Sequence, residues 1–262
     1  MVRGLLRNAL IVLGLLLETE AAKAGAWTLP RGHGQVLTGV TFSNASKIYD
    51  GAGHAANPII FNKMFIQSWM EYGASDALTL IAVPEYIDAD WGTEKDKLAH
   101  IHSASIAVGG RLLLTKRLGI MSMQVLAKRA GSFNMSYTTT GDAGNQFELR
   151  FLCGDNFRIA NRDGYVDFEV AHRFVDGERP NEISLDAAIG LWLQQDSLLL
   201  LQGFSTTSRG TSNISYSQYK LEASLVHRIN KRWGLQSGYF FTPAGRNIVQ
   251  ESGSVVTIWF HW

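Results

Sequence analysis

From Gln35 to the end of the chain, apolar and polar residues alternate in short segments, without the 3.6-residue period of amphipathic helices. Alternation places successive side chains on opposite faces of a β-strand. Val166 and Phe168, for example, alternate with Asp167 and Glu169. The pattern predicts about twelve strands. They span residues 36–42, 61–72, 78–86, 101–114, 120–129, 146–153, 165–174, 183–194, 198–206, 218–229, 235–242 and 254–262.

Short and long connections alternate between these segments. The short ones are 73–76, 115–119, 154–164, 195–197 and 230–234. The long ones, rich in Gly, Ser, Asn and Thr, are 43–59, 87–100, 130–145, 175–182, 207–217 and 243–253. A hairpin and its loop therefore recur about every forty residues. This regularity predicts that short turns gather at one end of the fold and long loops at the other.

Two architectures fit such strands, a soluble β-sandwich and a transmembrane β-barrel. A sandwich buries its apolar faces, whereas a barrel turns them toward lipid and closes so that no strand edge is unpaired. Short turns alternating with long loops are typical of barrels whose turns face the periplasm. Aromatic residues near the strand ends suit the interfacial girdles of membrane proteins. These aromatics are Tyr72, Tyr86, Trp91, Tyr165, Phe174, Trp233 and Tyr239.

The last nine residues, SVVTIWFHW, carry apolar side chains at alternate positions and finish on an aromatic residue. This ending resembles the final strand by which the barrel-assembly machinery recognises bacterial outer-membrane barrels. The residues that match are Val256, Ile258, Phe260 and Trp262, with Trp262 in place of the usual Phe. The resemblance implies that these side chains face lipid and form the assembly signal. The predicted fold is all-β: a transmembrane, antiparallel, up-and-down β-barrel of about twelve strands.

Residues 1–26 read as a secretory signal peptide. Arg3 and Arg7 precede a short apolar run at 9–17, and small residues follow it. The run is about half the length that spans a bilayer, which favours cleavage over an uncleaved anchor. Cleavage is predicted after Ala24 or after Ala26, leaving 27–262 as a single barrel domain.

Composition narrows the class further. Mean hydropathy is −0.01 over 262 residues, which excludes a bundle of membrane-spanning helices. One cysteine excludes a disulfide scaffold, and a net charge of +1 gives no field that would recruit nucleic acid. An export signal together with a barrel pattern predicts the outer membrane of a Gram-negative bacterium, with lipid and lipopolysaccharide as surroundings.

A second resemblance runs through most of the chain. The segment WTLP at 27–30, GQV at 34–36 and WMEYG at 69–73 are its main motifs, with YKL at 219–221 and Arg232-Trp233 in later hairpins. These motifs look like parts of the putative transporter family linked to meta-pathway phenol degradation. The resemblance implies a mid-sized barrel for small molecules, and no site residue is carried over from it.

If the apolar faces meet lipid, the opposite faces line the lumen, where cations and anions nearly balance. This balance argues against a strongly charge-selective pore. A salt-bridged network that fills the barrel and a narrow passage lined by mixed charge both remain open. The candidate lumen residues are Lys63, Glu71, Arg111, Lys128, Glu148, Arg150, Asp167, Glu169, Arg173, Asp186, Lys220, Glu222 and Arg228.

Other chemistry is weakly indicated. His100 and His102 share one strand face and could serve a lipid hydrolase, but no lipase-like serine motif surrounds them. Asp88, Asp90 and the acids at 94 and 96 could hold a divalent cation, although a solvated acidic loop fits them better. No catalytic, cofactor or metal site is predicted. The expected function is passive passage of an unknown small molecule, with a plugged structural or surface-interaction barrel second and a lipid hydrolase third.

Overall fold

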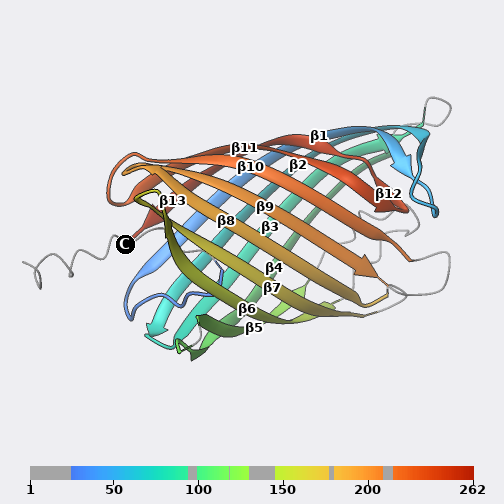
Figure 1. Ribbon diagram of the computed structural model, residues 1–262. Coiled ribbons are helices and arrows are strands. Elements are labelled where there is room, and N and C mark those ends of the chain that lie inside the picture. The colour runs from blue at the N-terminus through green and yellow to red at the C-terminus, as the bar shows by residue number, and fades with distance from the viewer. Residues whose placement is uncertain (1–24, 94–98, 118, 130–144, 177–179, 209–214) are drawn as a thin grey trace, which may run out of the picture.

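The computed structural model describes residues 25–93, 99–117, 119–129, 145–176, 180–208 and 215–262. Its chain forms one antiparallel sheet that closes on itself into a barrel (Figure 1). Twelve of its strands are long, and a two-residue strand is added near the end. The strands are β1 Gly34–Tyr49, β2 Ala55–Ser75, β3 Leu78–Gly92, β4 Ala99–Thr115, β5 Ile120–Arg129, β6 Asn145–Ile159, β7 Arg162–Val175, β8 Glu182–Gln194, β9 Ser197–Ser208, β10 Ser217–Arg228, β11 Trp233–Arg246, β12 Ile248–Val249 and β13 Ser252–His261.

Each long strand pairs with the next in sequence, and β1 pairs with both β2 and β13. Leu37 of β1 thus stands opposite Trp69 of β2 on one side and Trp259 of β13 on the other. This seam removes the free edges that an open sheet would expose. The predicted all-β, up-and-down barrel of twelve long strands is confirmed.

The strands are longer than the sequence pattern indicated, because pairing continues into the expected loops. The prediction of a turn at 154–164 was wrong: β6 and β7 stay paired until Ile159 meets Arg162. Only Ala160 and Asn161 turn the chain, both with positive φ (48° and 61°). A two-residue turn of this kind matches the twist of the flanking strands, so the hairpin needs no longer connection.

Short connections gather at one end of the barrel, the turn end, and the longer ones at the other, the loop end. The C-terminus lies at the turn end (Figure 1). There, Gly34 and Trp262 exchange backbone hydrogen bonds of 3.1 and 3.0 Å. The alternation of short and long connections therefore sorts them spatially, as predicted.

The two faces of the wall differ in chemistry. Outward positions carry apolar side chains, among them Phe168, which is 50% exposed, and Ile258. Residues 78–83 and 198–201 are apolar on both faces, so alternation leaves their orientation open. The structure turns Val83 and Leu198 inward, where both are buried. Two of the expected girdle aromatics point inward instead. Trp91 packs against a buried apolar group near the loop end, and Tyr165, which is 3% exposed, packs edge-on to Trp27 inside the barrel.

The inner face is not uniformly polar, which corrects the expectation from alternation. Near the turn end, apolar side chains from several strands meet inside the barrel. Ile81, Val83, Ala107 and Leu126 form a second apolar group on the inner wall of β3–β5. The first group is Ala26, Trp27, Leu152, Tyr165, Leu198, Leu200, Val226 and Trp259. A lumen of this width lets side chains reach one another and exclude water.

The segment before β1 enters the barrel instead of passing beside it. Ala26 is completely buried and Trp27 nearly so, both within the inner apolar group. Leu29 donates its backbone N–H to the Thr79 hydroxyl at 2.8 Å. Residues 25–33, the N-terminal segment, therefore fill part of the turn end. No helix among the described residues is long and apolar enough to cross a membrane.

Candidate functional site in the barrel interior

The thirteen charged residues selected from the sequence lie at inward-facing strand positions and are buried or half-buried. Most of them are joined into small ionic groups by neighbours from adjacent strands. Burying a charge is costly unless it is paired and hydrogen-bonded. Within each group, acids and bases therefore lie close enough to offset one another's charge.

The central group surrounds Arg150 of β6. Its Nε donates to Glu148 Oε1 at 2.9 Å and its Nη1 to Asp186 Oδ2 at 2.6 Å. Nη1 also donates to the carboxylate of Glu169. One guanidinium thus binds three carboxylates from three strands, which leaves the group with excess negative charge.

Arg173 extends this group toward the loop end. Its Nη2 donates to Glu148 Oε2 at 2.7 Å and its Nη1 to Glu182 Oε2 at 2.6 Å. The Tyr216 hydroxyl donates to the other oxygen of Glu182. Charge-assisted and bidentate contacts of this kind hold planar groups in fixed orientations.

A separate group forms around Glu251, just before β13. This carboxylate is 1% exposed and accepts from Lys63 Nζ at 2.7 Å and from the Ser43 hydroxyl at 3.0 Å. Lys220 makes a second ion pair with it. Two cations therefore share one anion, the reverse of the arrangement around Arg150.

At the turn end, Arg111 links the wall to the N-terminal segment. Its Nη2 donates to Glu71 Oε1 at 2.8 Å and to Gln124 Oε1 at 2.9 Å, while Nη1 donates to the Trp27 carbonyl at 2.9 Å. Glu71 also accepts from Gln35 Nε2 at 2.6 Å. Arg111 is only 2% exposed, so its charge depends on these partners.

The remaining candidates are bound more locally. Lys128 pairs with Glu85. Glu222 accepts from the Ser224 hydroxyl at 2.6 Å. Arg228 lies over the ring of Trp192, 4.8 Å from its centroid, as in a cation–π contact.

Asp167 is held by the N-terminal segment and not by a basic side chain. It accepts the Ala26 backbone N–H at 2.8 Å and lies within hydrogen-bonding reach of Glu169. Among the described residues no Lys or Arg forms a salt bridge with it.

Three acids of these groups were missed by sequence reasoning: Glu85, Glu182 and Glu251. Glu182 precedes the predicted strand start by one residue, and Glu251 lies in a predicted loop. Each shares the inward parity of a neighbouring strand, as Glu251 does with Thr257 and Trp259. Extending the strands at constant parity would have found Glu182 and Glu251. Glu85 lies within the predicted strand 78–86, whose two apolar faces left its orientation open.

Three cavities follow one another through the interior. The cavity nearest the loop end, about 200 Å³, is lined in part by Lys128 and Arg173. A central one of about 330 Å³ shares Trp69 and Arg150 with it. A third, of about 380 Å³ at the turn end, shares Trp259 with the central cavity. The shared side chains separate neighbouring spaces and are the narrow points of the interior.

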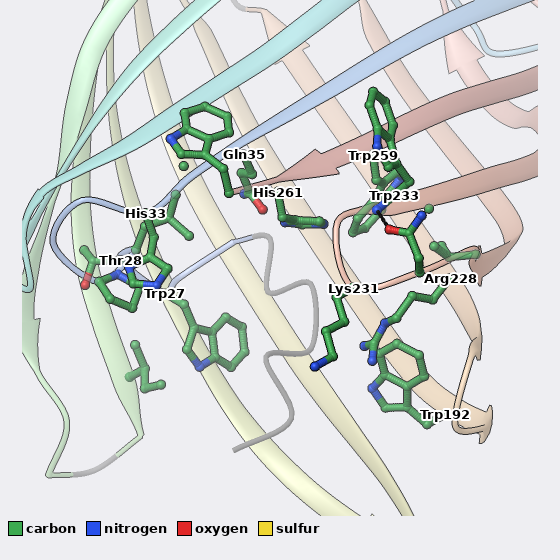
Figure 2. Close-up of a pocket in the computed structure, with 18 of the residues that line it drawn as sticks. Trp27, Thr28, His33, Gln35, Trp192, Arg228, Lys231, Trp233, Trp259 and His261 are labelled. Atoms are coloured by element: carbon green, nitrogen blue, oxygen red, sulfur yellow. Dashed lines mark hydrogen bonds between the residues drawn. The ribbon is translucent and has the colours of Figure 1, made fainter. Parts of the chain in front are cut away.

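The turn-end cavity lies between the N-terminal segment and the opposite wall (Figure 2). Trp27 and His33 stand on one side, and Trp233 and Arg228 on the other (Figure 2). Its lining combines indole rings with basic side chains, so it differs from the acid-rich central cavity.

The histidine pair has a different setting from the interior. His100 and His102 are exposed on the outer face of β4 near the loop end, with ring centroids 6.0 Å apart. His100 Nδ1 lies 2.9 Å from Asp90 Oδ1, and its Nε2 lies 3.7 Å from Asp88 Oδ2. Ser103 directly follows His102 in sequence, so its side chain is on the opposite face of β4. The acids at 94 and 96 lie outside the described residues. In the described part of the chain, no three His, Cys, Asp or Glu side chains converge as metal ligands.

No family model matches the sequence, and no curated protein matches it. Solved structures do. An outer-membrane channel from Pseudomonas putida F1 is 10% identical, with a TM-score of 0.64 over 93% of this chain and 100% of that one. The translocator domain of the autotransporter NalP from Neisseria meningitidis is 12% identical, with a TM-score of 0.57 over 98% and 95%. The NanC porin is 8% identical, with a TM-score of 0.50 over 87% and 98%.

These neighbours share a fold although their sequence identity to this chain is very low. Their names describe different roles: a channel, a translocator and a porin. The common feature is a closed antiparallel barrel, which agrees with the apolar outer wall and the outer-membrane location predicted from the sequence. The chain therefore has the fold of bacterial outer-membrane β-barrels.

Proposed function

We propose that this barrel is a narrow, passive channel for small molecules across the Gram-negative outer membrane, and not an enzyme. The observation that carries the proposal is the row of three cavities inside the barrel, in which only Trp69 and Arg150, and then Trp259, stand between one cavity and the next. A barrel filled only for rigidity has no need of such a row of cavities.

The lining favours small solutes that tolerate both charge and aromatic surface. Both acids and bases line the central cavity, with acids in excess, and indole rings line the turn-end cavity. Mixed charge disfavours strong selection between cations and anions. The resemblance of the sequence to the transporter family linked to meta-pathway phenol degradation agrees with this role.

Reconstitution into a planar bilayer tests the proposal. Folded protein should give small, reproducible single-channel steps, whereas detergent alone and heat-unfolded protein should give none. Folded protein that inserts but conducts nothing would contradict the channel proposal. Liposome swelling with neutral solutes of increasing size would then define the passage.

A plugged structural or surface-interaction barrel is the second candidate, and a specific observation favours it. The N-terminal segment occupies part of the turn end, with Ala26 completely buried. In this case lipid and lipopolysaccharide, and a partner of the loops, would be the relevant contacts. A barrel without conductance that still assembles fully would support this alternative. A lipid hydrolase is third, and His102→Ala tests it because any lipase activity retained by the variant removes the histidine pair from consideration.

We also propose that the C-terminal strand is the part read by the barrel-assembly machinery. Val256, Ile258 and Trp262 are exposed on the outer wall, and Phe260 is partly exposed beside Trp233. Their outward position leaves them accessible to a recognition partner before lipid covers them.

A further inference from the structure

Gly25, the first described residue, lies directly against a carboxylate inside the barrel. A Cβ at this position would stand 2.3 to 2.5 Å from the carboxylate atoms of Asp167, and Gly25 has a φ of +94°. Both conditions exclude an ordinary side chain. The backbone here is thus packed as closely to Asp167 as a glycine allows.

Within the described residues, no Lys or Arg makes a salt bridge with this carboxylate. Asp167 lies within hydrogen-bonding reach of Glu169, whose own cation, Arg150, is shared with Glu148 and Asp186. Two carboxylates in contact cannot both remain ionised at low cost without a cation or a shared proton. The nearby guanidinium of Arg111 is already bound to Glu71. The pair therefore has room for one more cation.

The N-terminal segment is fixed immediately after Gly25. The Ala26 N–H donates to Asp167 at 2.8 Å, and the Trp27 carbonyl accepts from Arg111 at 2.9 Å. Cleavage after Ala26 would remove the first of these bonds and a completely buried side chain. Cleavage after Ala24 keeps both and begins the mature chain at the residue that touches Asp167.

We propose that the leader is removed between Ala24 and Gly25, and that the new α-ammonium group pairs with Asp167 and Glu169 and locks residues 25–33 into the turn end. Hydrolysis of this peptide bond consumes one water and leaves a carboxylate on Ala24 and an amine on Gly25, which is protonated at neutral pH. The missing cation is thereby produced by the processing step itself. A barrel that still carries its leader lacks it. The inference goes beyond the channel function and does not depend on conductance.

The first test is the mass and N-terminal sequence of the protein purified from outer membranes. The expected mature chain begins at Gly25. A chain that begins at Trp27, or one that retains Met1, would overturn the proposal.

The second test measures whether the new amine is protected. Folded protein in detergent is treated with an acetylating N-hydroxysuccinimide ester, and modification is located by mass spectrometry. Relative to the exposed Lys116, the Gly25 amine should react at least about tenfold more slowly when folded and at a similar rate after heat unfolding. Equal rates in the folded protein would overturn the ion pair.

A pair of variants localises the protection. The double variant Asp167→Asn/Glu169→Gln should expose the amine to acetylation, whereas Asp163→Asn, an exposed change on the same strand, should not. Unchanged protection in the double variant would contradict the assigned partners. If the double variant does not fold, as judged by loss of heat-modifiable mobility, the wild-type sequencing and labelling still decide the proposal. Failure of the bilayer experiment leaves all three readouts untouched.

Discussion

Arg111 donates to the backbone carbonyl of Trp27 at 2.9 Å, a contact between residues 84 positions apart in sequence. The same guanidinium neutralises Glu71. One side chain therefore fixes the N-terminal segment and satisfies the most deeply buried acid of the turn end. Shared ionic partners of this kind also organise the groups around Arg150 and Glu251.

Arg111→Met should destabilise the barrel strongly, because Glu71 would be left as a buried, uncompensated charge. Breaking a buried pair from one side costs about 3–5 kcal/mol. Urea unfolding in detergent micelles, followed by tryptophan fluorescence, measures the loss. Arg117→Met, in the exposed β4–β5 turn, is the matched control and should change little. Adding Glu71→Gln to Arg111→Met should recover part of the stability, and no recovery would argue against charge as the cause.

Arg150→Gln should increase the preference of the channel for cations. Its guanidinium is the shared partner of Glu148, Glu169 and Asp186, so its removal exposes their negative charge to the cavity it lines. The reversal potential in a salt gradient should move toward the cation equilibrium value. Arg158→Gln, an exposed arginine of the β6–β7 hairpin, should leave the potential unchanged. A shift of equal size in both variants would refute a role for Arg150 in the passage.

Trp259→Ala should widen the passage, because this indole separates the central cavity from the turn-end cavity. Single-channel conductance should rise clearly above that of the wild type. Stability should fall at the same time, by about 3–5 kcal/mol for a buried aromatic residue. Phe241→Ala removes an aromatic ring from the outer wall and serves as the control for conductance. Unaltered conductance in a folded Trp259→Ala barrel would mean that the two cavities do not form one route.

Trp262→Ser should reduce insertion into the outer membrane, while Trp262→Phe should preserve it. The reason is that the proposed assembly signal needs an aromatic residue at the end of the last strand. The fraction of heat-modifiable protein in isolated outer membranes provides the measurement. Equal insertion of the two variants would remove Trp262 from the signal.

The contacts that Asp50 makes in the loop after β1 should weaken in acid. Asp50 lies outside the strands, and backbone N–H groups of His54 and Ala52, at 2.8 and 2.9 Å, hold its pKa below the ordinary value of an aspartate. Because the pKa of Asp50 is lower in the folded protein, its ionised carboxylate stabilises the loop at any pH above the ordinary pKa of an aspartate. This stabilisation is lost as the pH falls through the lowered pKa of the folded state. The side-chain carboxyl resonance of Asp50, followed by NMR, should titrate below about 3.9. A midpoint at or above that value would contradict the contact.

Alternation alone identified much of the wall and its inward charges. It failed where both faces of a strand are apolar, as at Leu198 and Leu200, because an alternating pattern then does not show which face points inward. It also stopped too early at the strand ends, so Glu182 and Glu251 were left in loops. Tyr165 was placed in a girdle because its position near a strand end says nothing about which face it occupies.

The sequence by itself determined the class of structure: hairpins of regular length, an apolar outer face and a terminal aromatic strand. These are local properties, set by side-chain period and turn composition. Only the tertiary structure decided which charges share a partner, where the cavities meet, and that the N-terminal segment lies inside the barrel. Arg111 meets Trp27, and Glu251 meets Lys63, across 84 and 188 residues of chain. Such contacts form only when the barrel closes, and a local sequence pattern holds no information about which distant residues closure brings together.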